Sequence, residues 1–419
     1  MRRGNSLVTL GVATACATLG VMPVFLVGAL AVLIRQDMAF NASQLGLVIA
    51  AFFAASATFS VPGGALSDRM GPRRSLLLSV SGSVVVLVGL ASLTQRWTHL
   101  LMLLFAAGAV NGLAQPAANL VLAARISAHR QGFAFGIKQS AVPGATLLAG
   151  ISVPVVSANL GWQSAFWGGV LLAVGLLVLT ALYIRETAAP RAAAGARLDA
   201  APSPSRIALV LIAVGGGLGV GAATCLGAFL VDSTVERGIS IQTAGLLLSL
   251  GSAVGVTGRL LVGWLADKHG GDQLIRVSVM LAVGAVGFGL VSVVGPPSVL
   301  VIGTVLAFGA GWGWAGIYVY ALVLLHPRAP GKASGIAQVG AASGAMLGPA
   351  AFGAIVERSS YTAGWISAAT AASLAAALLL LSARLTPPAR PQIHDVTQLR
   401  TEDRSRALAC GHTMNGDAG

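Results

Sequence analysis

Long apolar segments constrain this chain more than any other feature. A helix needs roughly 20 apolar residues to cross the hydrocarbon core of a bilayer, and stretches of that length recur along the chain with short polar breaks. The segment LLLSVSGSVVVLVGLASL, residues 76–93, is apolar on every side. A strand of a membrane β-barrel instead alternates apolar and polar residues over about 10 positions. The sequence therefore predicts an all-α membrane protein.

Composition and charge agree with a chain that is nearly all membrane domain. Hydrophobic residues make up 56% and charged residues 9%, and the mean hydropathy is +0.83. The net charge of +13 lies in the loops between spans, so it indicates topology and not a nucleic-acid partner. Cys16 and Cys225 fall inside apolar spans and Cys410 in a polar tail, so no disulfide is expected. The N-terminal segment imitates a signal peptide, but it stays apolar to about Ile34 and is interpreted as an uncleaved first helix.

Twelve transmembrane helices are predicted, in two halves of six. A linker rich in Ala, Pro and Arg separates the halves. The expected organisation is a six-helix bundle at 1–184, a cytoplasmic linker at 185–206, a second six-helix bundle at 207–384 and a disordered cytoplasmic tail at 385–419. The predicted spans are 7–34, 43–66, 75–95, 99–124, 133–157, 164–184, 207–231, 241–265, 274–294, 299–325, 333–357 and 363–383.

The basic residues predict the orientation. With the N-terminus in the cytoplasm, 20 of the 26 Lys and Arg residues fall on the cytoplasmic side, and only Arg35, Arg96, Arg237 and Arg358 fall on the other side. The remaining two are inside spans. This positive-inside bias predicts a multi-pass protein of the plasma (inner) membrane with both termini in the cytoplasm.

Several landmarks recur at one offset of 199 residues, the difference between Gly64 and Gly263. Asp68 with Asp267, Gly136 with Gly335, and Leu19-Gly20-Val21 with Leu218-Gly219-Val220 share this offset. So do Gly71 with Gly270 and Gln139 with Gln338. Single matches are easy in a chain rich in Ala and Gly, but five regions at one spacing indicate an internal duplication.

A charged motif lies between the second and third predicted spans. It reads GALSDRMGPRR from Gly64 to Arg74, with a weaker copy, GWLADKHGG, from Gly263 to Gly271. The pattern GxLxDRxGxR, together with twelve spans and a duplication, resembles the signature loop of the major facilitator superfamily of secondary transporters. The resemblance covers about residues 7–384 and implies that the two halves rock around a central cavity.

The resemblance assigns this motif to conformational gating. A carboxylate near a helix end can pair with a neighbouring Arg, and glycines let two helices approach. The alternative is plain cytoplasmic charge. The expected gating residues are Gly64, Asp68, Arg69, Gly71, Arg73, Gly263, Asp267, Lys268 and Gly270.

Two basic residues lie inside predicted spans, Lys138 in the fifth and Arg259 in the eighth. Ionisable groups at membrane depth are costly and mark functional sites by default. The alternative is that both side chains snorkel to the interface. Because no acid is expected at mid-depth, the pair favours an anionic substrate, which Arg259 could grip with its guanidinium fork. The segment GRLLVGWLAD around Arg259 is similar to the eighth helix of facilitators that move monocarboxylates or dicarboxylates, which also carry an arginine there.

Further polar residues are candidates for a cavity lining. Asn111, Gln115 and Asn119 follow one face of the fourth span, where such residues either line a cavity or hold helices together. Gln139, Tyr318, Tyr320 and Gln338 are candidates of the same kind. The segment GWGWAG at 311–316 matches GxGxxG, but it lies in an apolar span without a preceding strand, so nucleotide binding there is rejected.

The sequence predicts a transporter of a small organic anion, with a carboxylate as the favoured substrate group. The alternative is efflux of drugs or amphiphilic compounds, although the fourth-helix arginine of drug antiporters is absent near Gly108. A membrane enzyme is disfavoured because HExxH and GxSxG are absent, and no cofactor or metal is expected. We expect a monomer. Proton coupling would need a titratable group in the pathway, for which Lys138 is the obvious candidate, and uniport or exchange is equally open.

Overall fold

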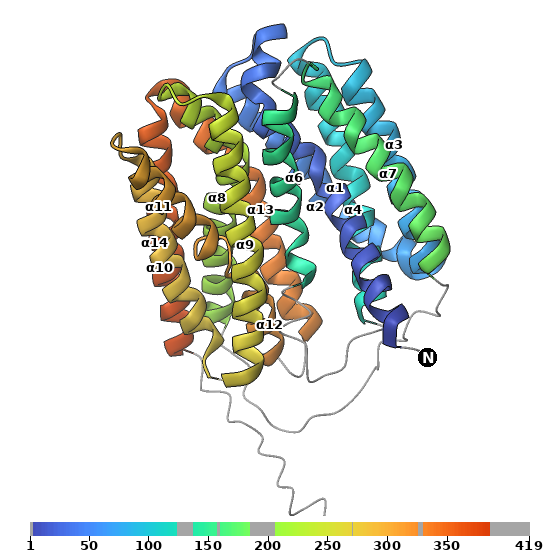
Figure 1. Ribbon diagram of the computed structural model, residues 1–419. Coiled ribbons are helices and arrows are strands. Elements are labelled where there is room, and N and C mark those ends of the chain that lie inside the picture. Colours follow the sequence, from blue (N-terminus) through green and yellow to red (C-terminus); the bar gives the residue numbers. More distant parts are fainter. Residues whose placement is uncertain are drawn as a thin grey trace, which may run out of the picture. The chain divides into compact units, whose positions relative to one another are not determined.

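The computed structural model describes residues 3–123, 137–156, 160–184, 206–269, 271–325 and 330–385 (Figure 1). These residues form helices joined by short turns, without a strand, and they belong to one compact unit that ends at Pro387. The predicted linker and tail lie outside the described residues, except that Arg206 is the first residue of α8 and Leu385 the last of α14. The all-α prediction is confirmed for the part of the chain that the structure describes.

Each half contributes a series of long helices. The first half contains α1 (Arg3–Asp37), α2 (Ala42–Met70), α3 (Pro72–Ser92), α4 (Trp97–Ala123), α6 (Ala141–Val156) and α7 (Gln163–Tyr183). The second contains α8 (Arg206–Glu236), α9 (Ile241–His269), α10 (Gln273–Ser292), α11 (Pro297–Gly309), α12 (Ala315–Leu325), α13 (Pro330–Arg358) and α14 (Tyr361–Leu385). Among the described residues, 11 helices are long and apolar enough to cross a bilayer, and the apolar helix α11 is shorter.

The single helix predicted at 299–325 is wrong. Five residues without helical structure separate α11 from α12 there. Gly311 and Gly313 weaken the helix at this point because glycine has a low helix propensity. The break also frees the carbonyl of Trp312, which accepts two hydrogen bonds from Arg259. A side chain from another helix therefore replaces the lost backbone partners.

The charged motif is also different from the loop that the sequence predicted. Residues Gly64–Met70 continue α2 as a helix, and Pro72 already begins α3, so Gly71 alone joins them. Gly71 has a φ of 81°, a conformation that a residue with a Cβ adopts only at a cost. In the second half, α9 continues to His269. Both motifs are therefore helix ends.

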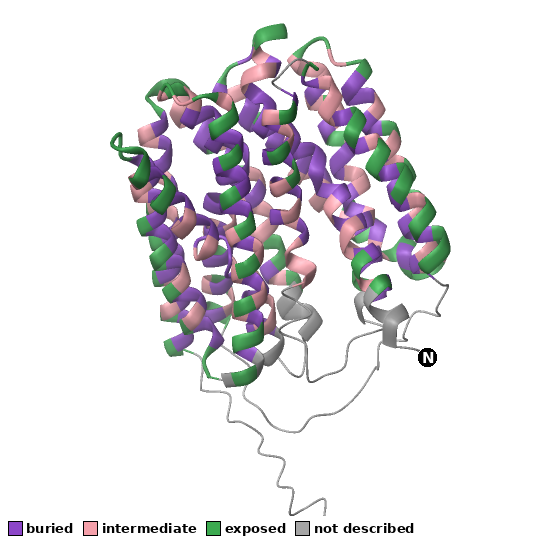
Figure 2. Cartoon of the chain, viewed as in Figure 1, coloured by how far each residue is buried: buried purple, intermediate pink, exposed green. Residues whose placement is uncertain are grey.

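Many large apolar side chains are exposed on the described helices. Val61, Val85, Met102 and Leu171 each expose at least 70% of their surface, while buried residues face neighbouring helices (Figure 2). In water such a surface would drive aggregation, but lipid chains are as apolar as these side chains. The pattern is that of a helix bundle surrounded by lipid.

Glycine contacts between the halves repeat the internal duplication. A Cβ on Gly46 of α2 would lie 2.3 Å from the Pro349 carbonyl oxygen of α13. The equivalent residues, 199 positions away in each half, are Gly245 of α9 and Gly150 of α6, and a Cβ on Gly245 would lie 2.9 Å from the Gly150 carbonyl oxygen. The contact between α2 and α13 is therefore repeated by the contact between α9 and α6, as pseudo-twofold symmetry requires.

The helices α1 and α8 are also related by the pseudo-twofold symmetry and contact each other. Gly28 and Gly227 are repeat mates, and a Cβ on Gly28 would lie 2.7 Å from the Gly227 carbonyl oxygen. Contacts this close hold the backbones together and leave no space for solvent. They lie toward the end where α1 ends at Asp37 and α8 ends at Glu236, which is called the Arg35 end below. The opposite end, where α2 ends, is called the Asp68 end.

Candidate functional site

Arg259 lies at the contact between the two halves. Its side chain comes from α9 and is 2% exposed. The guanidinium Nε donates to the Trp312 carbonyl at 3.2 Å and Nη2 donates to the same oxygen at 2.9 Å. Nη1 donates to the carbonyl of Gln139, which belongs to the first half. Arg259 therefore does not snorkel to a surface, and it links α9 to the other half.

The charge of Arg259 has no acidic partner among the described residues. Its three hydrogen bonds there all go to carbonyl oxygens, and the one ion pair in the described residues involves other side chains. Lys138 is half-buried next to Gln139, and its charge repels that of Arg259. Of the five N–H groups of an arginine, two are left for another acceptor. The region is therefore electropositive.

A cavity of about 80 Å³ lies next to Gln139, whose carbonyl accepts a hydrogen bond from Arg259. Arg259 itself is not one of the lining residues of this cavity. Gln139 and Gln338, which are repeat mates, both line it, so each half contributes one amide. No described residue bonds to either side-chain amide. Tyr318 and Trp314 also line the cavity, but the Tyr318 hydroxyl donates to the Ile212 carbonyl at 2.8 Å. The free polar groups of this cavity are therefore the two glutamines.

Buried aromatic rings pack next to the arginine. The Arg259 guanidinium lies 5.7 Å from the centroid of the Trp312 ring, a cation–π distance. The Trp312 ring packs edge-on against Phe25 of α1 at 5.8 Å and against Phe308 at 5.5 Å. A positive group beside apolar rings suits a ligand that has both an anionic end and an apolar body.

The polar stripe of α4 is used in packing within the first half. The buried Asn111 amide donates to Ser56 Oγ of α2 at 2.8 Å. The Gln115 amide donates to the Ala17 carbonyl of α1 at 3.3 Å and to Asn111 Oδ1 at 3.2 Å. Asn119 is exposed. These contacts hold α4 against α1 and α2, which is the second of the two roles that the sequence left open.

The motif residues of the first half lie at the Asp68 end. Asp68 and Arg69 are exposed in the last turn of α2, and neither forms an ion pair with another described residue. Arg73 donates to the Ala181 carbonyl of α7 at 3.0 Å, so it holds α3 against α7. Gly71 is the turn itself. The structure places these residues together, and their role in gating stays a prediction.

The second copy of the motif has a different environment. Gly263 is buried, and the Lys268 ammonium lies 5.0 Å from the centroid of the Trp264 ring. Asp267 is part of α9, but its side chain lies outside the described part of the structure. Gly270 lies outside the described residues.

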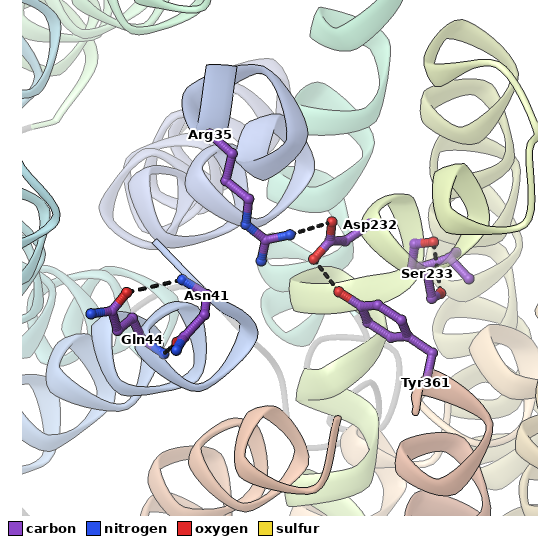
Figure 3. Close-up of polar contacts among 7 residues, drawn as sticks. Arg35, Asn41, Gln44, Asp232, Ser233 and Tyr361 are labelled. Carbon is purple, nitrogen blue, oxygen red and sulfur yellow. Dashed lines mark hydrogen bonds and ion pairs between the residues drawn. The ribbon is translucent and has the colours of Figure 1, made fainter. Parts of the chain in front are cut away.

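A polar cluster that the sequence analysis did not predict lies at the Arg35 end. Arg35 of α1 forms an ion pair with Asp232 of α8 at 2.9 Å, and the Tyr361 hydroxyl of α14 donates to the other carboxylate oxygen (Figure 3). Asp232 is 5% exposed. The signal was present, because Arg35 and Asp232 differ by 197 residues, close to the repeat offset. Helices that meet on a pseudo-twofold axis bring such positions together.

These features define a class of protein. Repeated helical halves with lipid-facing surfaces, joined around a small cavity to which each half contributes an amide, are the architecture of a secondary membrane transporter. The sequence profile of the Major Facilitator Superfamily matches residues 10–328 and again 212–409. The chain belongs to this superfamily, as its motif indicated.

Similar proteins include several transporters. The probable sulfoacetate transporter SauU of Cupriavidus necator is 32% identical over 160 residues, 37% of this chain and 36% of that protein. The gallate transporter of Pseudomonas putida is 24% identical over 379 residues, 79% of each chain. The class G tetracycline resistance protein of Vibrio anguillarum is 34% identical over 149 residues, 33% of this chain and 36% of that protein. The matches to SauU and the tetracycline protein therefore span about a third of those relatives.

A solved structure has the same fold. The crystal structure of the human organic anion transporter MFSD10 superimposes with a TM-score of 0.65 at 17% identity. The superposition covers 92% of this chain and 100% of that one. This likeness establishes the fold.

Proposed function

We propose that the protein moves a small organic anion across the membrane by alternating access. The observation that carries the proposal is Arg259, a guanidinium 2% exposed whose partners among the described residues are carbonyl oxygens alone. Carbonyl oxygens accept three hydrogen bonds from its N–H groups but leave its charge uncompensated. An unpaired charge at membrane depth costs several kcal/mol, roughly 2.5 to 3.5 on insertion scales. An anionic ligand would recover part of that cost.

The location of Arg259 relates binding to movement of the halves. Nη1 donates to Gln139 of the first half, whereas Nε and Nη2 donate to Trp312 of the second. An anion that reached the guanidinium would compete with the Gln139 carbonyl and change a contact between the halves. Binding energy would then be spent on the conformational change, as alternating access requires.

The paired glutamines support a substrate with a hydrogen-bonding group besides its charge. Gln139 and Gln338 line the same cavity from the two halves, and each amide can donate and accept. A hydroxyl or second carboxylate could therefore contact both halves at once. The cavity of about 80 Å³ has room for on the order of five waters, which favours a small substrate.

Relatives support both the proposal and its alternative. SauU and the gallate transporter are named for sulfoacetate and gallate, and MFSD10 is described as an organic anion transporter. The tetracycline resistance protein favours drug efflux, for which the buried rings of Phe25, Phe308 and Trp312 near Arg259 would be suitable. Among the described residues no acid pairs with Arg259 or Lys138, which favours the anion, because an organic cation would need a buried carboxylate.

The positive-inside count predicts the side of the membrane on which the Arg35 end and the Asp68 end lie. It places Arg35 on the outer side and the charged motif in the cytoplasm. The close glycine contacts then close the outer side, and we infer that the structure represents a state closed to the outside. The gating assignment for the motif at Asp68 fits this orientation, because the motif lies at the end that must open and close toward the cytoplasm.

The test is uptake by purified protein in proteoliposomes. Small carboxylates and sulfonates are compared with neutral isosteres of the same shape, and substrate-induced thermal stabilisation is measured in parallel. Arg259→Ala is expected to abolish both signals for the anion, and Arg259→Lys to weaken them by about tenfold or more through loss of the fork geometry. Lys138→Ala should have a smaller effect.

Arg237→Ala is the matched control, because Arg237 also donates to backbone carbonyls, those of Val291 and Val293, away from the cavity. It should leave anion uptake near the wild-type rate. Normal anion uptake by Arg259→Ala, or a wild-type preference for the neutral isostere, would contradict the proposal and favour drug efflux. Accumulation of any solute would also separate a transporter from an enzyme or a receptor.

A further inference from the structure

The polar cluster at the Arg35 end joins three helices from both halves. Arg35 lies on α1 of the first half, whereas Asp232 on α8 and Tyr361 on α14 belong to the second half (Figure 3). Arg35 Nη1 lies 2.9 Å from Asp232 Oδ1, and Tyr361 donates to Asp232 Oδ2. Tyr361 therefore positions the carboxylate within its own half, and Arg35 alone crosses to the other half.

The cluster lies at the edge of an open recess of about 520 Å³. Arg35, Asp232 and Tyr361 line this recess together with Phe40, Asn41, Glu236 and Glu357. The Arg35 guanidinium also lies 5.0 Å from the centroid of the Phe40 ring. Water can therefore reach the edge of the ion pair, although Asp232 itself is 5% exposed. A carboxylate this buried is costly without its cationic partner.

We propose that Arg35, Asp232 and Tyr361 form a latch that holds the Arg35 end shut and must break each time this end opens. The inference rests on alternating access by the two halves and does not depend on the substrate. Among the described residues, this is the one ion pair, and it connects the two halves that alternating access separates. At this end the glycines let the backbones of the two halves pack closely. The latch adds an ion pair that forms only when the two halves are correctly aligned.

The geometry fits a contact that opens repeatedly. The pair is a single Nη1–Oδ1 contact, because Arg35 Nε and Nη2 have no hydrogen-bond partner among the described residues. A fork-like pair with two parallel bonds would be stronger. A single charge-assisted bond at the edge of an open recess is strong enough to bias the equilibrium and weak enough to exchange with water. When it breaks, the recess can hydrate both charges.

The experiment measures cysteine accessibility in purified protein in detergent, so that membrane orientation plays no part. A reporter cysteine is placed at Ala42, which lines the recess and is 7% exposed, in a background with Cys16, Cys225 and Cys410 replaced by Ala. Asp232→Asn and Arg35→Gln are each expected to increase the rate of maleimide labelling about tenfold, or about 1.4 kcal/mol. Tyr361→Phe should give a smaller increase, since it leaves the ion pair in place.

Two controls separate a latch from a general loss of structure. Glu236→Gln removes a carboxylate one turn further along α8 in the same recess and should leave labelling unchanged. The exchange of charges in Arg35→Asp with Asp232→Arg should return the labelling rate toward that of wild type. Wild-type labelling in Asp232→Asn would overturn the latch. Equal acceleration by Glu236→Gln, or fast labelling that the charge exchange leaves unrestored, would also overturn it.

Failure of the latch and failure of the anion proposal are distinguishable. Labelling at Ala42 is measured without substrate, and the Arg259 variants are expected to keep the wild-type response to Asp232→Asn. Anion uptake in turn depends on Arg259, whichever residues close the Arg35 end. A normal latch with no anion transport would leave this inference intact and refute the substrate proposal.

Discussion

The glycine contact between α2 and α13 allows a quantitative prediction about closure at the Arg35 end. An added Cβ in Gly46→Ala would lie 2.3 Å from the Pro349 carbonyl oxygen and 3.2 Å from the Ala350 Cα. Ordinary contacts begin at about 3.5 Å, so the two helices must separate by roughly 1 Å. Both neighbouring atoms belong to the backbone of α13, which cannot move aside as a side chain can.

The expected cost falls on one conformation. Overpacking of this kind costs about 1 to 3 kcal/mol. The clash arises only when α2 and α13 are in contact, so it destabilises the conformation with a closed Arg35 end. The population with a closed Arg35 end should therefore fall about 5- to 150-fold relative to the open one. The same cysteine at Ala42 reports this change, because Ala42 precedes Gly46 by about one turn of α2. Its labelling rate should rise accordingly.

Gly168→Ala on α7 is the control. A Cβ there would meet no atom within 4 Å, so labelling at Ala42 should not change. Gly245→Ala, the repeat mate of the Gly46 change, would place its Cβ 2.6 Å from Val153 Cβ and should act like Gly46→Ala. If Gly46→Ala labels no faster than Gly168→Ala, close packing at this contact does not determine which end is shut.

Three further predictions concern other parts of the molecule. Asp68→Asn should slow turnover in proteoliposomes while the apparent affinity stays within a few fold, because Asp68 is exposed at the end of α2; a large affinity loss at an unchanged maximal rate would assign it to the substrate site. Single cysteines at Ser203 and Ala189 should resist an impermeant thiol reagent in intact cells, and labelling without lysis would reverse the predicted orientation. Trp162→Phe should lower thermal stability by about 1.5 to 3 kcal/mol, since the indole donates to Asp37 Oδ2 at 2.7 Å; an unchanged melting temperature would show that this hydrogen bond contributes nothing.

Some site residues were predictable because position along a helix fixes depth in a membrane. Arg259 and Lys138 were found as charges inside apolar runs, and their common region in the structure follows from the fold. Gln139 and Gln338 were found as repeat mates, and both line one cavity. The partners of Arg259 were not predictable, because the Trp312 carbonyl is free only where α11 and α12 are interrupted.

The sequence by itself determined the class of fold, the positions of most helices and the duplication. Hydropathy is a local property, and a bilayer forces every long apolar segment to satisfy its backbone hydrogen bonds within itself as a helix. Contacts between segments depend on which faces meet, and no local pattern contains that information. The tertiary structure alone decided that Arg35 meets Asp232, that Asn111 bonds to Ser56, and that Gly46 packs on Pro349. The first and third contacts exist because two repeated halves pack around one pseudo-twofold axis, whereas Asn111 and Ser56 are brought together by helix packing within the first half.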